Sequence, residues 1–338
     1  MKFDTSFFFS TLLFSIIIYF IIFFKRKIIA IYFGINDIPD FIRKKHKKPV
    51  PKTAALSLSV TFGFSLIISL IFDFFDIDIK IILFSILVLF LIGLADDKIN
   101  LSPYIKLFLI SSLVITSLKI SNNLIVERVY FESFNKFIFF KDFSLFFTVL
   151  CVLLLINSLN LADGINGLAL GIVLSWLTHI LISFNFEFNS IVCVVFLITI
   201  ISFYHNYHEK HFLGDSGSIL LSAFCSYLII NYSNNLIKLK LPPLSGEKIF
   251  ILFMLPGIDM FRLFLERILK KKNPLLGDRN HIHHYLLKRN SLKKSLAIYL
   301  LALNIPIILT WYLNINTTYV IISSVFLYIL SLYFLKKI

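Results

Sequence analysis

The sequence predicts an all-α fold, a polytopic membrane bundle of about ten or eleven transmembrane helices. Hydrophobic residues make up 58% of the 338 residues and charged residues 15%. In soluble proteins, apolar residues average about 45–50% and charged residues about 25%. The apolar residues form continuous runs of roughly 20, the length that a helix needs to cross a bilayer. These features exclude a soluble domain, a disordered chain and an outer-membrane barrel, whose strands would alternate apolar and polar residues.

Eleven apolar runs are expected to span the membrane as one domain over residues 1–338. The first is not expected to be a cleaved signal peptide, because its basic cluster Lys25-Arg26-Lys27 follows the apolar run instead of preceding it. A short β-hairpin is expected in the longest outer segment, 121–142. The predicted spans are 7–24, 54–72, 80–95, 104–120, 143–158, 168–184, 190–205, 218–232, 248–266, 295–313 and 318–335.

The distribution of basic residues predicts which side each loop faces. Segments 25–53 and 267–294 each carry nine Lys and Arg residues, and the loops assigned to the inner side hold 22 against nine for the outer side. By the positive-inside rule, the N-terminus is expected outside and the C-terminus inside. Topology and anionic lipids therefore explain the net charge of +14, and no nucleic-acid partner is expected.

Cysteine usage predicts no disulfide framework. Cys151, Cys193 and Cys225 each lie inside an apolar run, and no CxxC pair is present.

Polar residues that are costly in a membrane gather in four inner segments. The first is Asp96-Asp97, at the end of the third span. The helix dipole opposes each carboxylate there by about 0.3–1 kcal/mol, and a divalent cation would relieve that cost. The alternative is a hydrated loop that merely ends the helix. Ser102 and Pro103 are expected to cap and begin the next helix.

The second and third segments read NSLNLADGINGL and FLGDSGS. Asn157, Asn160 and Asp163 are spaced by three residues and share one face if the helix continues. In the other segment, the glycines around Asp215 allow close approach to a phosphate or a metal. In both segments the alternative is structural, because Asp163 and Asp215 could instead cap the helices that follow.

The fourth segment contains PGID and DRNHIHH. Asp259 and Arg262 fall inside the ninth span, where charges are functional candidates unless they satisfy each other. Three histidines beside Arg279 favour an anion site for phosphate over a zinc site, since no cysteine supports zinc. They are His281, His283 and His284. A transporter with an intramembrane Asp/Arg pathway is the alternative function, although no internal repeat is evident.

The ordered motifs resemble the polyprenyl-phosphate N-acetylhexosamine-1-phosphate transferases. The resemblance covers residues 38–287 and is carried by IPDFIRKKH, ADDKINLSPYIK, NSLNLADGINGLALG, FLGDSGS, PGID and DRNHIHH. It implies transfer of a sugar-1-phosphate from a UDP-N-acetylhexosamine to polyprenyl (undecaprenyl) phosphate, with release of UMP and the start of a lipid-linked glycan such as O-antigen. It also implies a cytoplasmic active site with Mg²⁺ or Mn²⁺, and leaves a homodimer open.

The resemblance assigns roles residue by residue. The implied catalytic residues are Asp96, Asp97 and Asp163, and the implied metal ligands are Asp97, Asp215 and Asn160. The implied substrate-binding residues are Lys45, His46, Asn157, Asn160, Arg279, His281, His283 and His284. The spacing HIHH is more similar to enzymes that use simple UDP-N-acetylhexosamines than to those that use the muramoyl-pentapeptide nucleotide.

Three departures from the family pattern concern the sugar-nucleotide pocket. The family usually has Gly-Gly at Ala54-Ala55 and Asp at Asn166. Before FLGDSGS it commonly has Asn followed by Pro-Ala, whereas this chain reads HNYHEKH, with Asn206 as the expected counterpart. These differences bear on the donor sugar more than on the chemistry.

Overall fold

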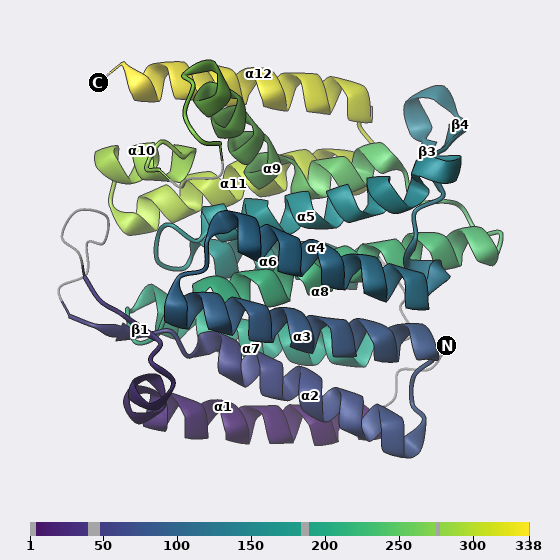
Figure 1. Cartoon of the computed structure of the whole chain (residues 1–338). Helices are drawn as coiled ribbons and strands as arrows, with labels where there is room; N and C mark the ends of the chain where they lie inside the picture. Colours follow the sequence, from purple (N-terminus) through teal and green to yellow (C-terminus); the bar gives the residue numbers. More distant parts are fainter. Residues whose placement is uncertain (1–4, 40–47, 184–188, 275–277, 338) are drawn as a thin grey trace.

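A computed structural model describes residues 5–39, 48–183, 189–274 and 278–337. In these residues the chain forms twelve α-helices and two small antiparallel ladders (Figure 1). The first part comprises α1 (Thr5–Phe33), β1 (Asn36–Asp37), β2 (Val50–Pro51), α2 (Ala54–Phe72), α3 (Ile77–Ile99), α4 (Pro103–Ile120), β3 (Arg128–Phe131) and β4 (Lys136–Phe139). The second part comprises α5 (Ser144–Ala162), α6 (Leu168–Ser183), α7 (Asn189–Tyr207), α8 (Gly214–Lys238), α9 (Gly246–Leu269), α10 (Ile282–Arg289), α11 (Leu292–Trp311) and α12 (Thr317–Lys336).

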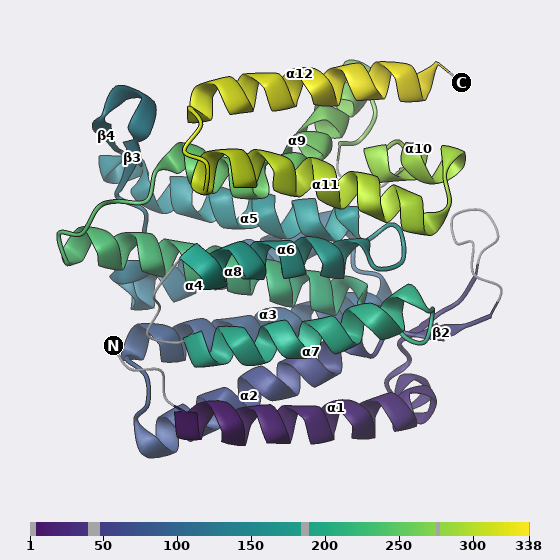
Figure 2. The ribbon, with the colours of Figure 1, turned by 180° about the vertical axis from the view of Figure 1, so that it is seen from behind.

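Most of the long helices run side by side in one bundle (Figures 1 and 2). Eight of the described helices are long and apolar enough to cross a membrane, so the chain is a multi-pass membrane protein. The hairpin β3–β4 lies at one end of the bundle, and the β1–β2 ladder and α10 lie at the other. The described chain begins at the hairpin end and finishes at the α10 end.

Each of the eleven predicted spans is a helix in the structure, and the predicted hairpin is confirmed as β3–β4. The predicted ends were too short for α1, which continues to Phe33, and for α8, which runs from Gly214 to Lys238. Lys25-Arg26-Lys27 in α1 and Ser233-Asn234-Asn235 in α8 interrupt the apolar runs before these helices end. Helix α10 was not among the predicted elements, because an eight-residue polar helix has no long apolar signal.

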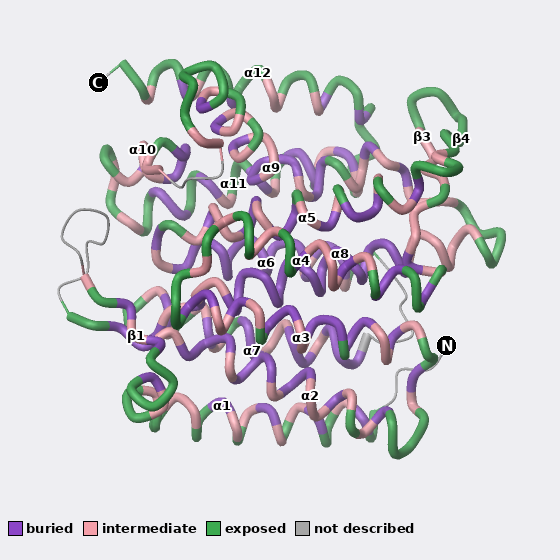
Figure 3. The backbone as a smooth tube through the Cα atoms, viewed as in Figure 1, coloured by how far each residue is buried: buried purple, intermediate pink, exposed green. Residues whose placement is uncertain are grey.

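Burial places α8 at the centre of the bundle (Figure 3). This helix is buried without interruption from Ser216 to Asn231 and packs against α2, α3, α5 and α6. The outer helices α1 and α12 expose large apolar side chains such as Phe24 and Phe326. Such an arrangement suits a lipid environment, where outward-facing apolar residues contact acyl chains instead of water.

Several serine and threonine hydroxyls inside the bundle form hydrogen bonds within their own helices. Ser222 donates to the carbonyl of Ser218 at 2.5 Å, and Ser226 donates to that of Ser222 at 2.7 Å. Thr61 and Ser65 in α2 make the same bond one turn back. These small polar residues permit close helix packing while their hydroxyls bond within their own helices.

The close approach of α3 to α8 depends on a glycine. A Cβ atom added to Gly93 would lie 2.5 Å from the Cα of Ser216 and 2.8 Å from its backbone nitrogen. Both contacts are with backbone, which has no side-chain rotation to relieve them. Because Gly93 lies one turn before Asp96 and Asp97, this packing sets how near the α3 carboxylates come to the start of α8.

Two predicted helix ends have different outcomes. Ser102 caps α4 by accepting the N–H of Ile105, and Pro103 is the first residue of that helix, as predicted. Asp163 is not the cap of α6, which begins at Leu168, but the residue that ends α5. Continuation of α5 to Ala162 places Asn157 and Asn160 on one helical face, as expected from their spacing.

Helix α9 differs from its neighbours in direction. It contains Pro256, and its C-terminal part turns away from the run of the other helices (Figures 1 and 2). Proline removes one backbone donor and its ring crowds the preceding turn, which bends a helix. Asp259 and Arg262 lie after this bend, near α10 and α12.

We predict that Gly93→Ala destabilises the bundle by about 1–3 kcal/mol, because α3 and α8 must separate to accept the methyl group. The matched control is Gly257→Ala in α9, where an added Cβ meets no atom within 4 Å. Thermal unfolding in detergent micelles should show a lower midpoint for Gly93→Ala and an unchanged or higher one for Gly257→Ala. Equal midpoints for the two variants would contradict the packing argument.

Candidate active site

A cavity of about 870 Å³ opens at the α10 end of the bundle. Its walls come from β1, the segment after β2, the α5–α6 and α7–α8 connections, the start of α8, and the segment around α10. These elements are distant in sequence, yet the four predicted polar segments either contribute residues to the lining or lie next to it. The lining includes Asp37, Lys52, Asn160, Asp163, Asn166, Asn206, Asp215, Asp278, Arg279 and His284.

Asp97 caps the start of α8 from another helix. One carboxylate oxygen accepts the N–H of Asp215 at 3.0 Å, and the other accepts the N–H of Ser216 at 3.0 Å and its hydroxyl at 2.7 Å. Lys52 adds an ion pair at 3.0 Å. The backbone donors at a helix start have no partner in their own helix, so a carboxylate is strongly stabilising there.

Gly214 makes that cap accessible. Its φ of +73° lies in the left-handed region, and a Cβ atom would approach an Asp97 carboxylate oxygen to 2.6 Å. The glycines beside Asp215 were predicted to allow close approach of a phosphate or a metal. At Gly214, the group that approaches closely is the Asp97 carboxylate of the protein itself. We did not foresee this role for Asp97 from the sequence.

Asp96 and Asp215 share one lysine. The ammonium of Lys106 lies 2.7 Å from Asp96 and also contacts Asp215. Asp96 additionally accepts the N–H of Leu101 at 2.7 Å. Like charges from α3 and α8 are thus held together by a cation from α4, and Asp215 is the carboxylate that reaches the cavity.

Asn160 and Asp163 bring the end of α5 to the same place. The Asn160 amide donates to Asp215 and to the Ser218 hydroxyl. The pKa of Asp163 is raised to about 7, mainly because the carboxyl group is buried and also because the negative charges of Asp215 and Asp97 are near. Its carboxylate has no side-chain hydrogen bond to the described residues, so Asp163 is available to a ligand in the cavity.

Two basic residues at the site, Lys52 and Lys106, had no predicted role; nor did the lining residues Asp37, Glu209 and Asp278. Burial opposes the charge of Lys52, but Asp97 beside it raises its pKa, so the ammonium form is stabilised. In the sequence Lys52 looks like part of a basic anchor, and Lys106 falls within an apolar span. The sequence signal for Lys106 was its position, because a charged residue inside a predicted membrane span is a functional candidate.

The predicted histidines divide into two groups. Arg279 and His284 line the cavity, whereas His281 and His283 are buried behind it. A Cβ added to Gly164 would collide with the rings of His283 and His284, so the turn after Asp163 packs directly on the histidine segment. The glycine of the ADG motif is explained by this contact.

The residues that depart from the family pattern connect two loops. The Asn206 side chain accepts the N–H of Gly167 at 2.6 Å and donates to the carbonyl of His211 at 3.2 Å. Asn166 donates to Glu209 at 2.9 Å. Both pairs tie the α5–α6 connection to the α7–α8 connection at the cavity wall, which makes Asn206 a structural support for this site.

The remaining predicted binding residues are Lys45, His46 and Asn157. Lys45 and His46 lie outside the described residues. Asn157 is described, but its amide donates to the carbonyl of Leu153 within α5, and the residue is not part of the lining. The expected face of three residues therefore contributes Asn160 and Asp163 to the cavity.

The donor set suits a hard divalent cation. Asp215, Asp163 and Asn160 offer carboxylate and amide oxygens, the ligands that Mg²⁺ and Mn²⁺ prefer. The raised pKa of Asp163 and the lysine drawn onto Asp96 and Asp215 are two signs of crowded negative charge at this place. Asp97, also predicted as a ligand, already accepts hydrogen bonds on both oxygens.

Comparison with known proteins identifies the family. A model described as glycosyl transferase family 4 matches residues 79–233. An undecaprenyl-phosphate alpha-N-acetylglucosaminyl 1-phosphate transferase of Thermotoga maritima is 30% identical over 266 residues, covering 78% of this chain and 76% of the relative. This chain belongs to glycosyl transferase family 4.

Other members of the family are similar over the same extent. An undecaprenyl-phosphate alpha-N-acetylglucosaminyl 1-phosphate transferase of Escherichia coli K12 is 26% identical over 286 residues, covering 79% of this chain and 72% of the relative. A probable undecaprenyl-phosphate N-acetylglucosaminyl 1-phosphate transferase of Bacillus subtilis is 28% identical over 272 residues, with coverage of 77% and 72%.

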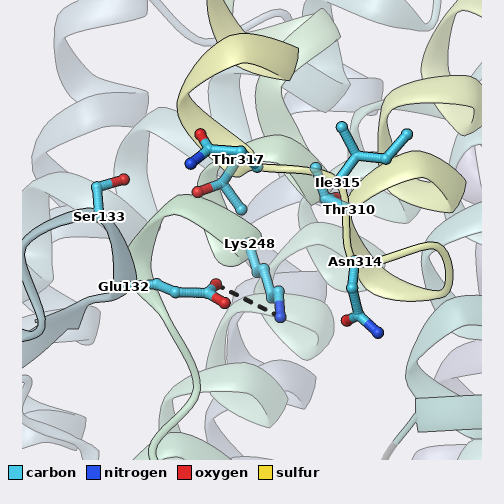
Figure 4. A pocket seen from close by; sticks show the side chains of 8 residues that line it. Glu132, Ser133, Lys248, Thr310, Asn314, Ile315 and Thr317 are labelled. Carbon is cyan, nitrogen blue, oxygen red and sulfur yellow. Dashed lines mark ion pairs between the residues drawn. The ribbon is translucent and has the colours of Figure 1, made fainter.

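The structure of this chain has a second, smaller pocket near the β3–β4 hairpin. It has a volume of about 210 Å³, and its lining comes from the segment after β3, the start of α9 and the α11–α12 connection (Figure 4). Glu132 and Lys248 form an ion pair of 3.4 Å across it. Opposite charges here already neutralise each other, in contrast to the crowded carboxylates of the large cavity.

We predict that Asp97→Asn lowers the free energy of unfolding by about 3 kcal/mol, because it leaves Lys52 and the donors of α8 without a charged partner. Asp163→Asn is the matched control, since it removes a carboxylate that is repelled by its neighbours. Its thermal midpoint should be equal to that of the unsubstituted protein or higher. A midpoint loss for Asp163→Asn as large as for Asp97→Asn would refute this division of roles.

Proposed function

We propose that this protein transfers an N-acetylhexosamine-1-phosphate from a UDP-sugar to a polyprenyl phosphate and releases UMP. The observation that carries the proposal is the convergence of Asp163, Asp215, Asn160, Arg279 and His284 on one cavity at one end of a membrane bundle. Acidic groups there could hold a cation, and basic groups could hold phosphates. The names and similarity of the relatives support the same activity.

The membrane fold fits an acceptor with a long apolar tail. Exposed apolar helix surfaces surround the bundle, and the polar cavity opens at one end. A lipid phosphate could therefore approach from the bilayer while a water-soluble nucleotide approaches from solution. The excess of basic residues in segments 25–53 and 267–294, which adjoin the cavity end, supports a cytoplasmic active site in the inner membrane.

Two anions have to meet in this reaction, so charge neutralisation is the main requirement. We assign Mg²⁺ or Mn²⁺ to Asp215, Asn160 and Asp163. When bound, the ion neutralises diphosphate oxygens and stabilises the leaving UMP. Arg279 and His284 are assigned to the donor diphosphate, since guanidinium and imidazole groups suit phosphate oxygens.

The bond changes can be written for a direct displacement. An oxygen of the lipid phosphate attacks the β-phosphorus of the UDP-sugar, and the bond from that phosphorus to the bridging oxygen breaks. UMP leaves with the bridging oxygen. Proton transfer from the lipid phosphate contributes little, because a second pKa of about 6 leaves that phosphate mostly ionised at neutral pH. Asp96, implied as a catalytic residue, is held by Lys106 and Leu101. A covalent aspartyl-phosphate route is the competing mechanism.

The proposed donor is a simple UDP-N-acetylhexosamine, and the lipid product would begin a cell-surface glycan such as O-antigen or another envelope polysaccharide. The HIHH spacing and the N-acetylglucosaminyl 1-phosphate transferases among the relatives support this choice. Asn166 and its partner Glu209 distinguish this cavity wall from the usual family pattern.

The direct experiment is to incubate purified protein with undecaprenyl phosphate, Mg²⁺ and a panel of UDP-sugars. UMP and a lipid-linked diphosphosugar are expected with UDP-N-acetylhexosamines, with loss on adding EDTA and recovery with excess Mg²⁺ or Mn²⁺. Release of UMP from none of the donors, with or without metal, would refute the proposed function.

We predict that Asp215→Asn reduces UMP release at least about 100-fold, because the carboxylate assigned to the cation becomes neutral. The protein should still insert in membranes. Asp142→Asn, an exposed residue between β4 and α5, is the matched control and should keep nearly full activity. Near-normal turnover by Asp215→Asn would remove this residue from the metal site.

A further inference from the structure

A second buried carboxylate, Asp259, organises the histidine segment from behind the cavity. It is 3% exposed and lies in α9 after the Pro256 bend. His281 donates to it at 2.8 Å, Tyr328 of α12 at 2.7 Å and Arg262 at 2.9 Å. One side chain thus joins α9, α10 and α12 near the active site.

The contacts of Asp259 determine how His281 is held. The ion pair with Arg262 keeps the carboxylate ionised, and an ionised carboxylate can only accept hydrogen bonds. The Nδ1 atom of His281 must therefore carry the proton that is shared with Asp259. This places the other ring nitrogen, Nε2, away from Asp259, where it is buried without a partner among the described residues.

Asp259 also holds the backbone at the start of α10. The N–H of Ile282, the first residue of that helix, lies 3.3 Å from both carboxylate oxygens. Arg262 donates at 2.6 Å to the carbonyl of Asn280. Together these bonds fix the backbone on both sides of His281, between the cavity residues Arg279 and His284.

The histidine rings continue the contact toward the cavity. His281 stacks on His283 with a centroid distance of 5.4 Å and an angle of 10° between the rings. His283 contacts His284, with centroids 4.2 Å apart, and Gly164 packs on both. A change at Asp259 would therefore reach the residues that line the cavity through packed rings and a short helix.

A metal ion is the other reading of this cluster. Asp259, His281 and His283 have ligand atoms within 4.8 Å of one another. However, the oxygens of Asp259 already accept bonds from Arg262, Tyr328, His281 and the Ile282 backbone, and a cation would have to displace several of them beside a guanidinium. The arrangement matches a carboxylate that orients a histidine better than it matches a cation site.

We propose that Asp259 is a positioning residue for the donor-binding wall of the cavity. Acting through His281 and the start of α10, it holds Arg279 and His284 where they meet the nucleotide diphosphate. This inference rests on the proposed transferase function. It assigns no direct contact with substrate to Asp259.

The test is a double-mutant cycle on Asp259→Asn and His281→Gln, measured as kcat/KM for the UDP-sugar. Asp259→Asn should lower kcat/KM about 10–100-fold, mostly through a higher KM for the UDP-sugar, with the KM for undecaprenyl phosphate unchanged. Because Asp259 acts in part through His281, the loss in the double variant should be smaller than the product of the two single losses. Binding of UDP in the presence of Mg²⁺, measured by calorimetry, should weaken in parallel.

Glu266→Gln is the matched control. Glu266 bonds Arg262 and Lys336 in the same network but makes no described contact with His281. Its kcat/KM should stay within about threefold of the unsubstituted protein, and combination with His281→Gln should multiply the two effects. If Asp259→Asn fails to fold, Tyr328→Phe removes a single bond to Asp259 and should give a smaller rise in the same KM.

Two results would overturn the inference. One is a folded Asp259→Asn protein with unchanged KM and UDP affinity, and the other is a double variant whose loss equals the product of the single losses. Turnover by the unsubstituted protein is the separate check on the transferase function. Its absence would refute that function and would leave the UDP-binding comparison as the test of Asp259.

Discussion

A buried carboxylate that caps a helix from another segment is the interaction on which this structure depends. Asp97, at the end of α3, accepts the backbone donors at the start of α8. Inside a membrane protein those donors have no water to bond, and an unpaired one costs several kcal/mol. Gly93 and Gly214 clear the space for this cap, so the central helix of the bundle starts where α3 ends. Asp215 is consequently placed one residue into α8, facing the cavity.

A second carboxylate, Asp259, caps the start of α10 in the same way. In each case a carboxylate from a long membrane helix accepts the first N–H groups of a helix that carries cavity residues, and a basic side chain, Lys52 or Arg262, pairs with it. The long helices are held by their apolar faces, while the site is held by a few charged contacts at one end. This separation allows polar chemistry at the membrane boundary without polar groups on the lipid-facing surface.

Much of the fold could be predicted because the apolar runs are long. All eleven predicted spans are helices in the structure and the outer hairpin is present, since hydropathy and turn length are local properties. α10 was missed because its eight residues are largely polar, and its position depends on Asp259, which is distant in sequence. The bend of α9 was also not anticipated, although Pro256 is its local cause.

The sequence predicted which residue types form the candidate site, but it did not predict most of the contacts between them. Asp163, Asp215 and Asn160 were expected together, and they meet at the cavity. That Asp97 bonds α8 could not be read from the sequence, because the bond requires the packing of α3 on α8. Lys52 resembled an anchor for lipid head groups, and its pairing with Asp97 appears only when β2 and α3 are placed together. Tyr328, 69 residues from Asp259, gave no local signal at all.

The central claim is that side chains from α5 and α8 gather around one divalent cation. Anomalous scattering from crystals grown with Mn²⁺ measures this directly. The account predicts a single strong peak in the cavity within bonding distance of Asp215, with Asp163 or Asn160 as a further ligand and with Lys106 displaced from Asp215. A peak that avoids Asp215, or a structure in which Asp163 and Asp215 are too far apart to share an ion, would contradict it.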